Sequence, residues 1–275
     1  MKLWEAIILG LVQGIAEFLP ISSSGHLSII QNLFNIQSAE EDHMLFNVLL
    51  HFATLISVCI FYWSDVREML QAAVGIVSPD RTKERKKKNP AGRLIIMIVA
   101  ATIPLVFVMP IKSQLEKLNT STSFIGIALI LTGFMLFVSD KMAVGSKTSK
   151  NMKIRDGLII GICQAVAVIP GLSRSGTTIT AGIATGLDRE FAVKFSFLIS
   201  IPAVLGATLL EIIDLFSVGI DIKLIPVYLV GMLVAGFVGY LSISIVKYIG
   251  KSGKFGRFAY YCWVVGVLTI ILSLI

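Results

Sequence analysis

Long apolar stretches alternate with short polar segments along the whole chain. Six of these stretches are long and uncharged enough to cross a hydrocarbon core of about 30 Å, which takes roughly 20 helical residues. They run approximately over Met44–Trp63, Leu94–Ile111, Ser123–Ser139, Phe195–Leu210, Leu224–Val246 and Phe258–Ile275. The pattern therefore predicts six transmembrane helices.

Two further apolar regions are interrupted in the middle by Pro, Gly and a cluster of serines. The interruptions read LPISSSGH at residues 19–26 and IPGLSRSGTT at residues 169–178. Pro and Gly followed by Ser predict that one helix ends and another begins. Each region is then two short helices, neither long enough to span. Broken backbone at membrane depth is tolerated only where protein or a water-filled cavity satisfies it, so we expect two re-entrant helical hairpins.

The two interrupted regions also resemble each other. At an offset of 151, the first region matches the second at Gly10, Gln13, Ala16, Ser22, Ser24 and Gly25. This indicates an internal repeat covering approximately residues 1–140 and 154–275 within a single membrane domain. An odd number of spans, three, separates the hairpins, so the halves would have inverted topology, and sites in such proteins gather near the midplane where broken helices meet.

Composition supports the membrane assignment and argues against a nucleic-acid partner. The 275 residues are 55% hydrophobic and 15% charged, with a mean hydropathy of +0.85. The formal net charge is +7, but the basic residues lie in short loops, as they do on the cytoplasmic side of membrane proteins. With re-entrant hairpins, 19 of the 24 basic residues fall on the side of the 64–92 loop. Only Lys2, Lys112, Lys117 and Lys223 fall on the other side, with both termini.

Glu17 is the strongest candidate for chemistry because a carboxylate within an apolar helix is costly in a bilayer and indicates function by default. Gln13 lies one turn earlier on the same face. The alternative is a carboxylate that merely pairs with a neighbouring polar group.

Ser22, Ser23, Ser24 and His26 follow Glu17 at the predicted start of a helix. The free N–H groups and positive dipole end of such a helix bind anions. Ser23 and His26 are three residues apart, and a hydroxyl beside an imidazole is a minimal pair for nucleophilic or acid–base chemistry. Either His26 or His51 could instead be a hydrogen-bonded interior residue.

The second interruption supplies Ser173, Arg174, Ser175 and Thr178. Arg174 keeps its charge and offers a rigid donor fork suited to phosphate. The pattern predicts a phosphate clamp in which both serine-rich helix starts converge, and Glu17 with Gln13 would hold a divalent cation, Mg²⁺ or Ca²⁺. A structural salt bridge between Arg174 and Glu17 is the alternative.

These residues resemble the motifs of the undecaprenyl-diphosphate phosphatase family, the bacterial bacitracin-resistance phosphatases. The segment from Gln13 to His26 looks like the family's (E/Q)xxxE motif with its serine cluster, and Pro170–Thr178 looks like PGxSRSxxT. Gln13 stands where many members have Glu, which leaves one carboxylate fewer for a cation.

The resemblance implies hydrolysis of undecaprenyl diphosphate to undecaprenyl phosphate and inorganic phosphate, with a divalent cation, at the outer side of the bacterial plasma membrane. It also implies six spans with two opposed hairpins. We expect Glu17, Ser23, His26 and Arg174 to be catalytic, with Ser23 activated by His26; direct attack by His26 or by water stays open. Gln13, Ser22, Ser24, Ser173, Ser175 and Thr178 would bind the lipid diphosphate. The rival function is a flippase or transporter of polyprenyl phosphate or another anion, and a homodimer is left open.

Overall fold

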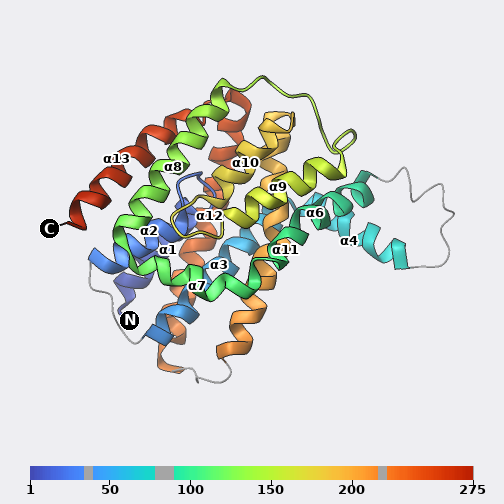
Figure 1. Ribbon diagram of the computed structural model, residues 1–275. Coiled ribbons are helices and arrows are strands. Elements are labelled where there is room, and N and C mark those ends of the chain that lie inside the picture. Colours follow the sequence, from blue (N-terminus) through green and yellow to red (C-terminus); the bar gives the residue numbers. More distant parts are fainter. Residues whose placement is uncertain (34–39, 78–89, 216–221, 275) are drawn as a thin grey trace.

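The described part of the chain is built of helices (Figure 1). The structure, a computed structural model, describes all residues except 34–39, 78–89, 216–221 and 275. The α-helices are α1 (Leu3–Ala16), α2 (Ser23–Leu33), α3 (Glu40–Phe61), α4 (Trp63–Val77), α6 (Pro90–Val106), α7 (Lys112–Glu116), α8 (Thr122–Lys141), α9 (Ile154–Val166), α10 (Arg174–Ala184), α11 (Arg189–Leu215), α12 (Ile225–Ser252) and α13 (Gly256–Leu272). Short 3₁₀ turns lie at Met109–Ile111, Lys117–Thr120 and Ile222–Leu224.

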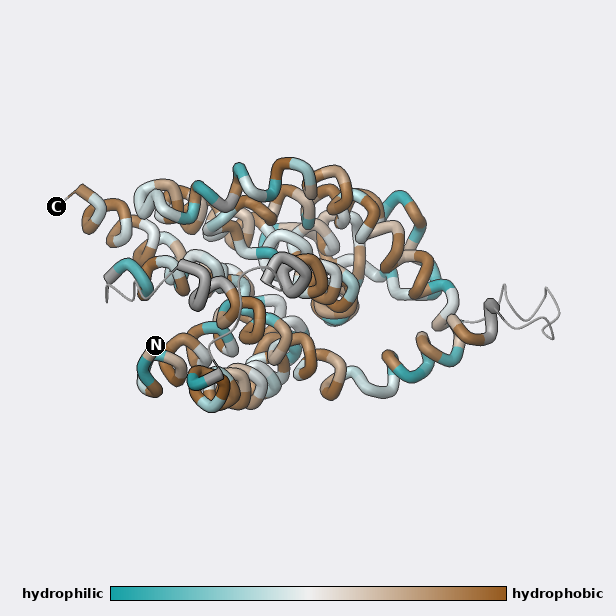
Figure 2. The backbone as a smooth tube through the Cα atoms, turned by 90° about the horizontal axis from the view of Figure 1, so that it is seen from below, coloured by the Kyte–Doolittle hydropathy of each residue, from teal (hydrophilic) through white to brown (hydrophobic). Residues whose placement is uncertain are grey.

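Among the residues that the structure describes, four helical segments are long and apolar enough to cross a membrane: Pro90–Leu115, Thr122–Lys141, Arg189–Leu210 and Ile225–Ser252. A fifth span is added if α3 and α4 are counted together, although their axes differ by 88°. The last predicted span falls on α13, which has 17 residues. Apolar residues run along most of the helices (Figure 2). The expectation of an all-helical, multi-pass membrane protein is therefore confirmed.

Both interrupted regions form two short helices joined by a turn, as predicted. In the first, α1 has 14 residues and α2 has 11, and in the second, α9 has 13 and α10 has 11. At 1.5 Å per residue each helix is about 17–21 Å long, less than a bilayer core. We call the turn at residues 17–22 tip 1 and the turn at residues 167–173 tip 2.

The bounds of these helices keep the offset seen in the sequence. α1 and α9 begin at residues 3 and 154, and α2 and α10 begin at residues 23 and 174, an offset of 151 in both cases. Even the local hydrogen bonds correspond, because the amide of Lys2 donates to Glu5 (2.6 Å) and the amide of Lys153 donates to Asp156 (2.9 Å). This correspondence supports the internal repeat, which beyond these helices stays a prediction.

We call α1, tip 1 and α2 the first unit, and α9, tip 2 and α10 the second unit. Each unit packs against a helix from the other half of the chain. α1 crosses α12 and α9 crosses α6. The crossings are close: a Cβ atom at Gly10 would lie 2.5 Å from the carbonyl oxygen of Gly231, and one at Gly161 would lie 2.5 Å from that of Ala101. Such small-residue contacts are the usual way for membrane helices to approach closely.

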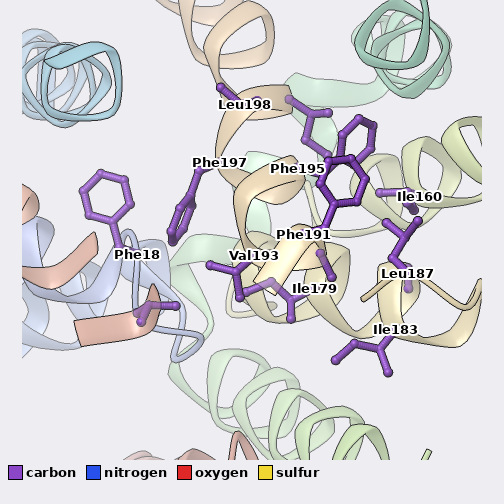
Figure 3. Close-up of a cluster of buried hydrophobic side chains, with 14 of the residues drawn as sticks. Phe18, Ile160, Ile179, Ile183, Leu187, Phe191, Val193, Phe195, Phe197 and Leu198 are labelled. Carbon is purple, nitrogen blue, oxygen red and sulfur yellow. The ribbon is translucent and has the colours of Figure 1, made fainter. Parts of the chain in front are cut away.

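Two further features hold the halves together. α8 and α13 run side by side (Figure 1) and meet at Gly126 and Gly266, where an added Cβ at either would lie 2.7 Å from the other's carbonyl oxygen. In the largest buried hydrophobic cluster, the ring of Phe18 on tip 1 meets that of Phe197 on α11 edge-on, with centroids 5.4 Å apart (Figure 3). Tip 1 is thus anchored on a helix of the second half.

The close crossing at Gly161 can be tested by adding a single methyl group. We expect Gly161→Ala to lower the stability of the detergent-solubilised protein by about 1–3 kcal/mol, because the backbone of α6 must move to make room. Gly206→Ala is the matched control, since an added Cβ there meets nothing within 4 Å and Ala is the better helix former. Thermal unfolding measures both, and equal melting temperatures would contradict the packing described.

Candidate functional site

The two tips lie against each other at the centre of the molecule, where the blue and yellow loops of Figure 1 approach. The hydroxyl of Ser175 donates to the carbonyl oxygen of Leu19 (3.3 Å), and the amide of Gly171 donates to the hydroxyl of Ser24 (3.5 Å). Both α2 and α10 therefore begin at this junction, with their N-terminal ends near one another. The convergence of the two serine-rich helix starts is confirmed.

Glu17 is the centre of the polar contacts between the tips. Its side chain is 7% exposed and its Oε1 lies 2.5 Å from Nη2 of Arg174. Its Oε2 accepts hydrogen bonds from the hydroxyl of Ser23 (2.7 Å) and the amide of Gln13 (3.1 Å). A buried carboxylate needs such partners to keep its charge away from water.

Ser23 and Arg174 occupy equivalent positions in the two units, at the offset of 151. Each is the first residue of its helix, and each points at the same carboxylate. The first unit thus contributes a neutral hydroxyl where the second contributes a cation. This asymmetry gives a site with a single carboxylate and a single guanidinium.

Arg174 still has donor capacity to spare. Its Nη1 is buried and has no hydrogen-bond partner among the described residues. A buried donor that has no acceptor costs free energy of folding. A guanidinium presents its donors as a fork that matches phosphate or carboxylate. The salt bridge that sequence offered as the alternative is present, yet it uses only part of the fork.

The remaining predicted ligands divide into two groups. Ser24, Ser173 and Ser175 line the cavity described below together with Ser23. Ser22 and Thr178 do not appear in its lining, and their side chains support the turns instead. The hydroxyl of Ser22 accepts from the amide of Gly25 (3.2 Å), and that of Thr178 donates to the carbonyl oxygen of Arg174 (2.8 Å).

His26 is directed away from Glu17 and is not hydrogen-bonded to Ser23. Its Nδ1 donates to the carbonyl oxygen of Ser22 (2.7 Å) and its Nε2 lies 2.8 Å from the hydroxyl of Tyr261, whose ring stacks on the imidazole. Along an α-helix, side chains three residues apart differ in direction by about 60°. This difference is enough for Ser23 and His26 to take different partners. The pairing expected from their spacing is thus absent in this geometry.

The imidazole that lies near Glu17 is that of His51 on α3. Its Nδ1 lies 2.9 Å from Nε2 of Gln13 and 3.4 Å from Oε2 of Glu17. The sequence did contain a signal, because an ionisable residue within an apolar span is a functional candidate. What it lacked was any indication that α3 passes beside tip 1.

A cavity of about 730 Å³ opens from this cluster. Its polar end includes Glu17, Ser23, His51 and Arg174. Its remaining wall includes polar side chains such as Lys112 and Asn119 but is largely apolar, and α6 and α11 contribute Leu105, Val106, Pro202, Val204 and Leu210 to it. A cavity that joins a cluster of charged and polar groups to a largely apolar wall suits an amphiphile.

The residues present fit a cation that is shared with a ligand better than one held by protein alone. No group of three His, Cys, Asp or Glu side chains suited to a metal occurs within the part of the chain that the structure describes. Glu17 is the carboxylate at the polar end, and the nearby Oε1 of Gln13 is buried without a hydrogen-bond partner there. Mg²⁺ is commonly held by one or two such oxygens plus phosphates and waters.

Comparison with known proteins gives a consistent result over the whole chain. The family described as bacitracin resistance protein BacA matches residues 6–268. A protein named undecaprenyl-diphosphatase from Methanosphaera stadtmanae is 38% identical over 100% of this chain and 99% of its own length. Another of that name from Halothermothrix orenii is 38% identical over 99% of both chains. Undecaprenyl-diphosphatase 3 of Bacillus cereus is 36% identical over 99% of this chain and 98% of its own.

The ion pair between the tips can be measured by a double-mutant cycle on stability. We expect Arg174→Ala to destabilise the protein by about 3–5 kcal/mol, because the buried carboxylate of Glu17 loses its cation. Glu17→Ala combined with Arg174→Ala should cost less than the sum of the single changes, since no unpaired charge remains. Thermal unfolding in detergent provides the measurement.

The control for this cycle is the pair Lys251 and Glu190, whose side chains are 59% and 44% exposed and whose charged atoms are 3.7 Å apart. Its coupling should not exceed about 1 kcal/mol. Additive effects at Glu17 and Arg174, no larger than those of the surface pair, would mean that the tips are not held by this contact.

Proposed function

This chain belongs to the bacitracin resistance protein BacA family, and from that membership we propose that it hydrolyses undecaprenyl diphosphate to undecaprenyl phosphate and inorganic phosphate. The activity would regenerate the lipid carrier of cell-wall synthesis. One observation carries the proposal beyond the family: a guanidinium with a buried, unpaired Nη1 lines a cavity whose wall is largely apolar. A diphosphate with a hydrocarbon tail has that same division.

The lipid would enter laterally between α6 and α11, which form the apolar wall of the cavity. Its tail can then stay among apolar groups while the diphosphate reaches the tips. There the N-terminal ends of α2 and α10, with Ser24, Ser173 and Ser175, offer donors to phosphate oxygens. Arg174 adds a permanent positive charge beside these donors.

Ser23 is the nucleophile in this proposal, because its hydroxyl lines the cavity and already donates to a carboxylate. Phosphate oxygens attract Arg174 away from Glu17, which leaves Glu17 free to accept the proton of Ser23. The oxygen of Ser23 bonds to the terminal phosphorus, the bond from that phosphorus to the bridging oxygen breaks, and undecaprenyl phosphate leaves. Water then hydrolyses the phosphoserine and releases inorganic phosphate.

His26 has a supporting part in this scheme and holds tip 1 in shape. Ser22 has a positive φ of 74°, a conformation that residues other than Gly adopt at a cost. His26 donates to the carbonyl oxygen of this residue and is itself fixed by Tyr261. This clamp keeps the start of α2, and with it Ser23, directed at Glu17.

Glu17 and Gln13 are the residues that would hold a divalent cation, Mg²⁺ or Ca²⁺. When bound, the cation would neutralise charge on the phosphate oxygens. His51 would then orient the amide of Gln13, whose Nε2 lies 2.9 Å from its Nδ1. With Gln in place of a second carboxylate, we expect a weakly held cation that binds together with the substrate.

The same proposal includes six membrane spans and two opposed re-entrant hairpins in a bacterial plasma membrane. α3 would supply one span and α13 another, and α4, which is turned by 88° from α3, would lie along the membrane surface. The distribution of basic residues supports termini outside the cytoplasm. Substrate would reach the site from the extracytoplasmic side.

The test of function is release of inorganic phosphate from undecaprenyl diphosphate by the purified protein in detergent. We expect steady release that a chelator abolishes and added Mg²⁺ or Ca²⁺ restores. Ser23→Ala should lower kcat by at least about 10³-fold. Ser28→Ala makes the same change elsewhere on α2 in the cavity wall and should retain most activity. A protein that only moves the lipid across the membrane would release no phosphate.

The role of His26 can be separated from general-base catalysis. We expect His26→Ala to lower kcat about 10–100-fold through misplacement of Ser23, and His26→Gln to recover much of the loss, because its amide can donate to the carbonyl oxygen of Ser22. The pH dependence of kcat should keep its shape in both variants. Complete inactivity of His26→Gln together with loss of one limb of the pH profile would show that the imidazole transfers the proton.

A further inference from the structure

A second groove adjoins tip 1. It has a volume of about 490 Å³ and is bounded by tip 1, the end of α12 and the start of α13. No residue of this groove lines the larger cavity. The two are therefore separate sites that share tip 1 as a wall.

Two cations flank the groove without acidic partners. Lys254 and Arg257 both line it and are exposed, and neither side chain makes a hydrogen bond or ion pair with the residues that the structure describes. The neighbouring acids are already engaged: Asp140 accepts from the backbone amides of Phe255 and Gly256, and Glu190 faces Lys251. The rim thus carries uncompensated positive charge.

The floor and sides of the groove are apolar. Ile15 and Leu19 from the first unit, and Ile249 and Phe258 from α12 and α13, form most of it. Ile15 is 41% exposed, which in a membrane means contact with lipid tails. Cations beside an apolar groove open to lipid match a phospholipid with an anionic headgroup.

We propose that this groove binds one anionic phospholipid, with its phosphate between Lys254 and Arg257 and an acyl chain along the apolar side. Tyr248 and Ser252 also line the groove. The hydroxyl of Tyr248 can donate to a headgroup oxygen, whereas that of Ser252 already donates to the carbonyl oxygen of Ile249 (2.9 Å). The site lies at the end of α12 that the basic-residue count assigns to the cytoplasm, where anionic lipids attract basic segments. A simple topology signal would need neither the groove nor its hydroxyls.

The groove is also connected to the proposed catalytic site through one side chain. Tyr261 lines it and contacts Nε2 of His26 at 2.8 Å. A lipid bound here would lie one side chain away from the residue that clamps tip 1.

Native mass spectrometry of the full-length protein in detergent tests this proposal, with phosphatidylglycerol and phosphatidylcholine of identical acyl chains as probes. We expect the wild type to retain phosphatidylglycerol about tenfold better than phosphatidylcholine. The double variant Lys254→Gln/Arg257→Gln should lose this preference. Because both side chains are exposed and unpaired among the described residues, the variant should fold normally, and its melting temperature without lipid verifies this.

The control is Lys150→Gln/Arg155→Gln, which removes two exposed charges from the same predicted side of the membrane but away from the groove. It should keep the preference for phosphatidylglycerol. Equal retention of phosphatidylglycerol by wild type and groove variant would overturn the proposal. An equal loss in the control would also overturn it, since the effect would then follow net charge. Full displacement of the lipid by inorganic phosphate at the same concentration would overturn it as well, because the acyl chain would then contribute nothing.

Discussion

A buried ion pair between two helix breaks is the contact on which the site depends. Glu17 and Arg174 are 157 residues apart in the chain, and removing either would leave the other's charge uncompensated in largely buried surroundings. Their attraction draws together two segments whose backbones are already interrupted. A charge in an apolar medium must be paired with an opposite charge. The two ionised side chains are therefore costly when separate, and their pairing joins the two turns. A phosphate ligand can satisfy the same guanidinium, so the contact that holds the tips is also the one that substrate would exchange.

The packing that brings the tips together is of a different kind. α1 crosses α12 and α9 crosses α6, each with a glycine against backbone. In lipid there is little hydrophobic gain from joining two apolar helices, so close van der Waals contact must supply the attraction. Because each unit packs on a helix of the opposite half, neither tip could be positioned by its own half alone.

The histidines show how far a motif determines a role. The spacing of Ser23 and His26 on one short helix allowed a catalytic pair, and both residues lie in the segment that resembles the family's motif. In the structure His26 supports the backbone of tip 1 while His51, from α3, contacts the Glu17 cluster. The contacts of His26 are those of a residue that holds the chain in place. The outcome depends on the rotation of α2 and the path of α3, and neither is a local property.

The sequence by itself determined the membrane character, the two helix breaks, the offset of 151 between them and the residues that meet at the tips. These follow from local physics: apolar runs of spanning length, Pro–Gly–Ser stops, and ionisable residues that apolar surroundings cannot tolerate unpaired. Only the tertiary structure decided that Ser23 faces Glu17, that His51 joins it, that α4 turns by 88° from α3, and that a cationic groove adjoins tip 1. Those features depend on contacts between segments far apart in the chain. Such contacts produce no repeating pattern of apolar and polar residues from which they could be predicted.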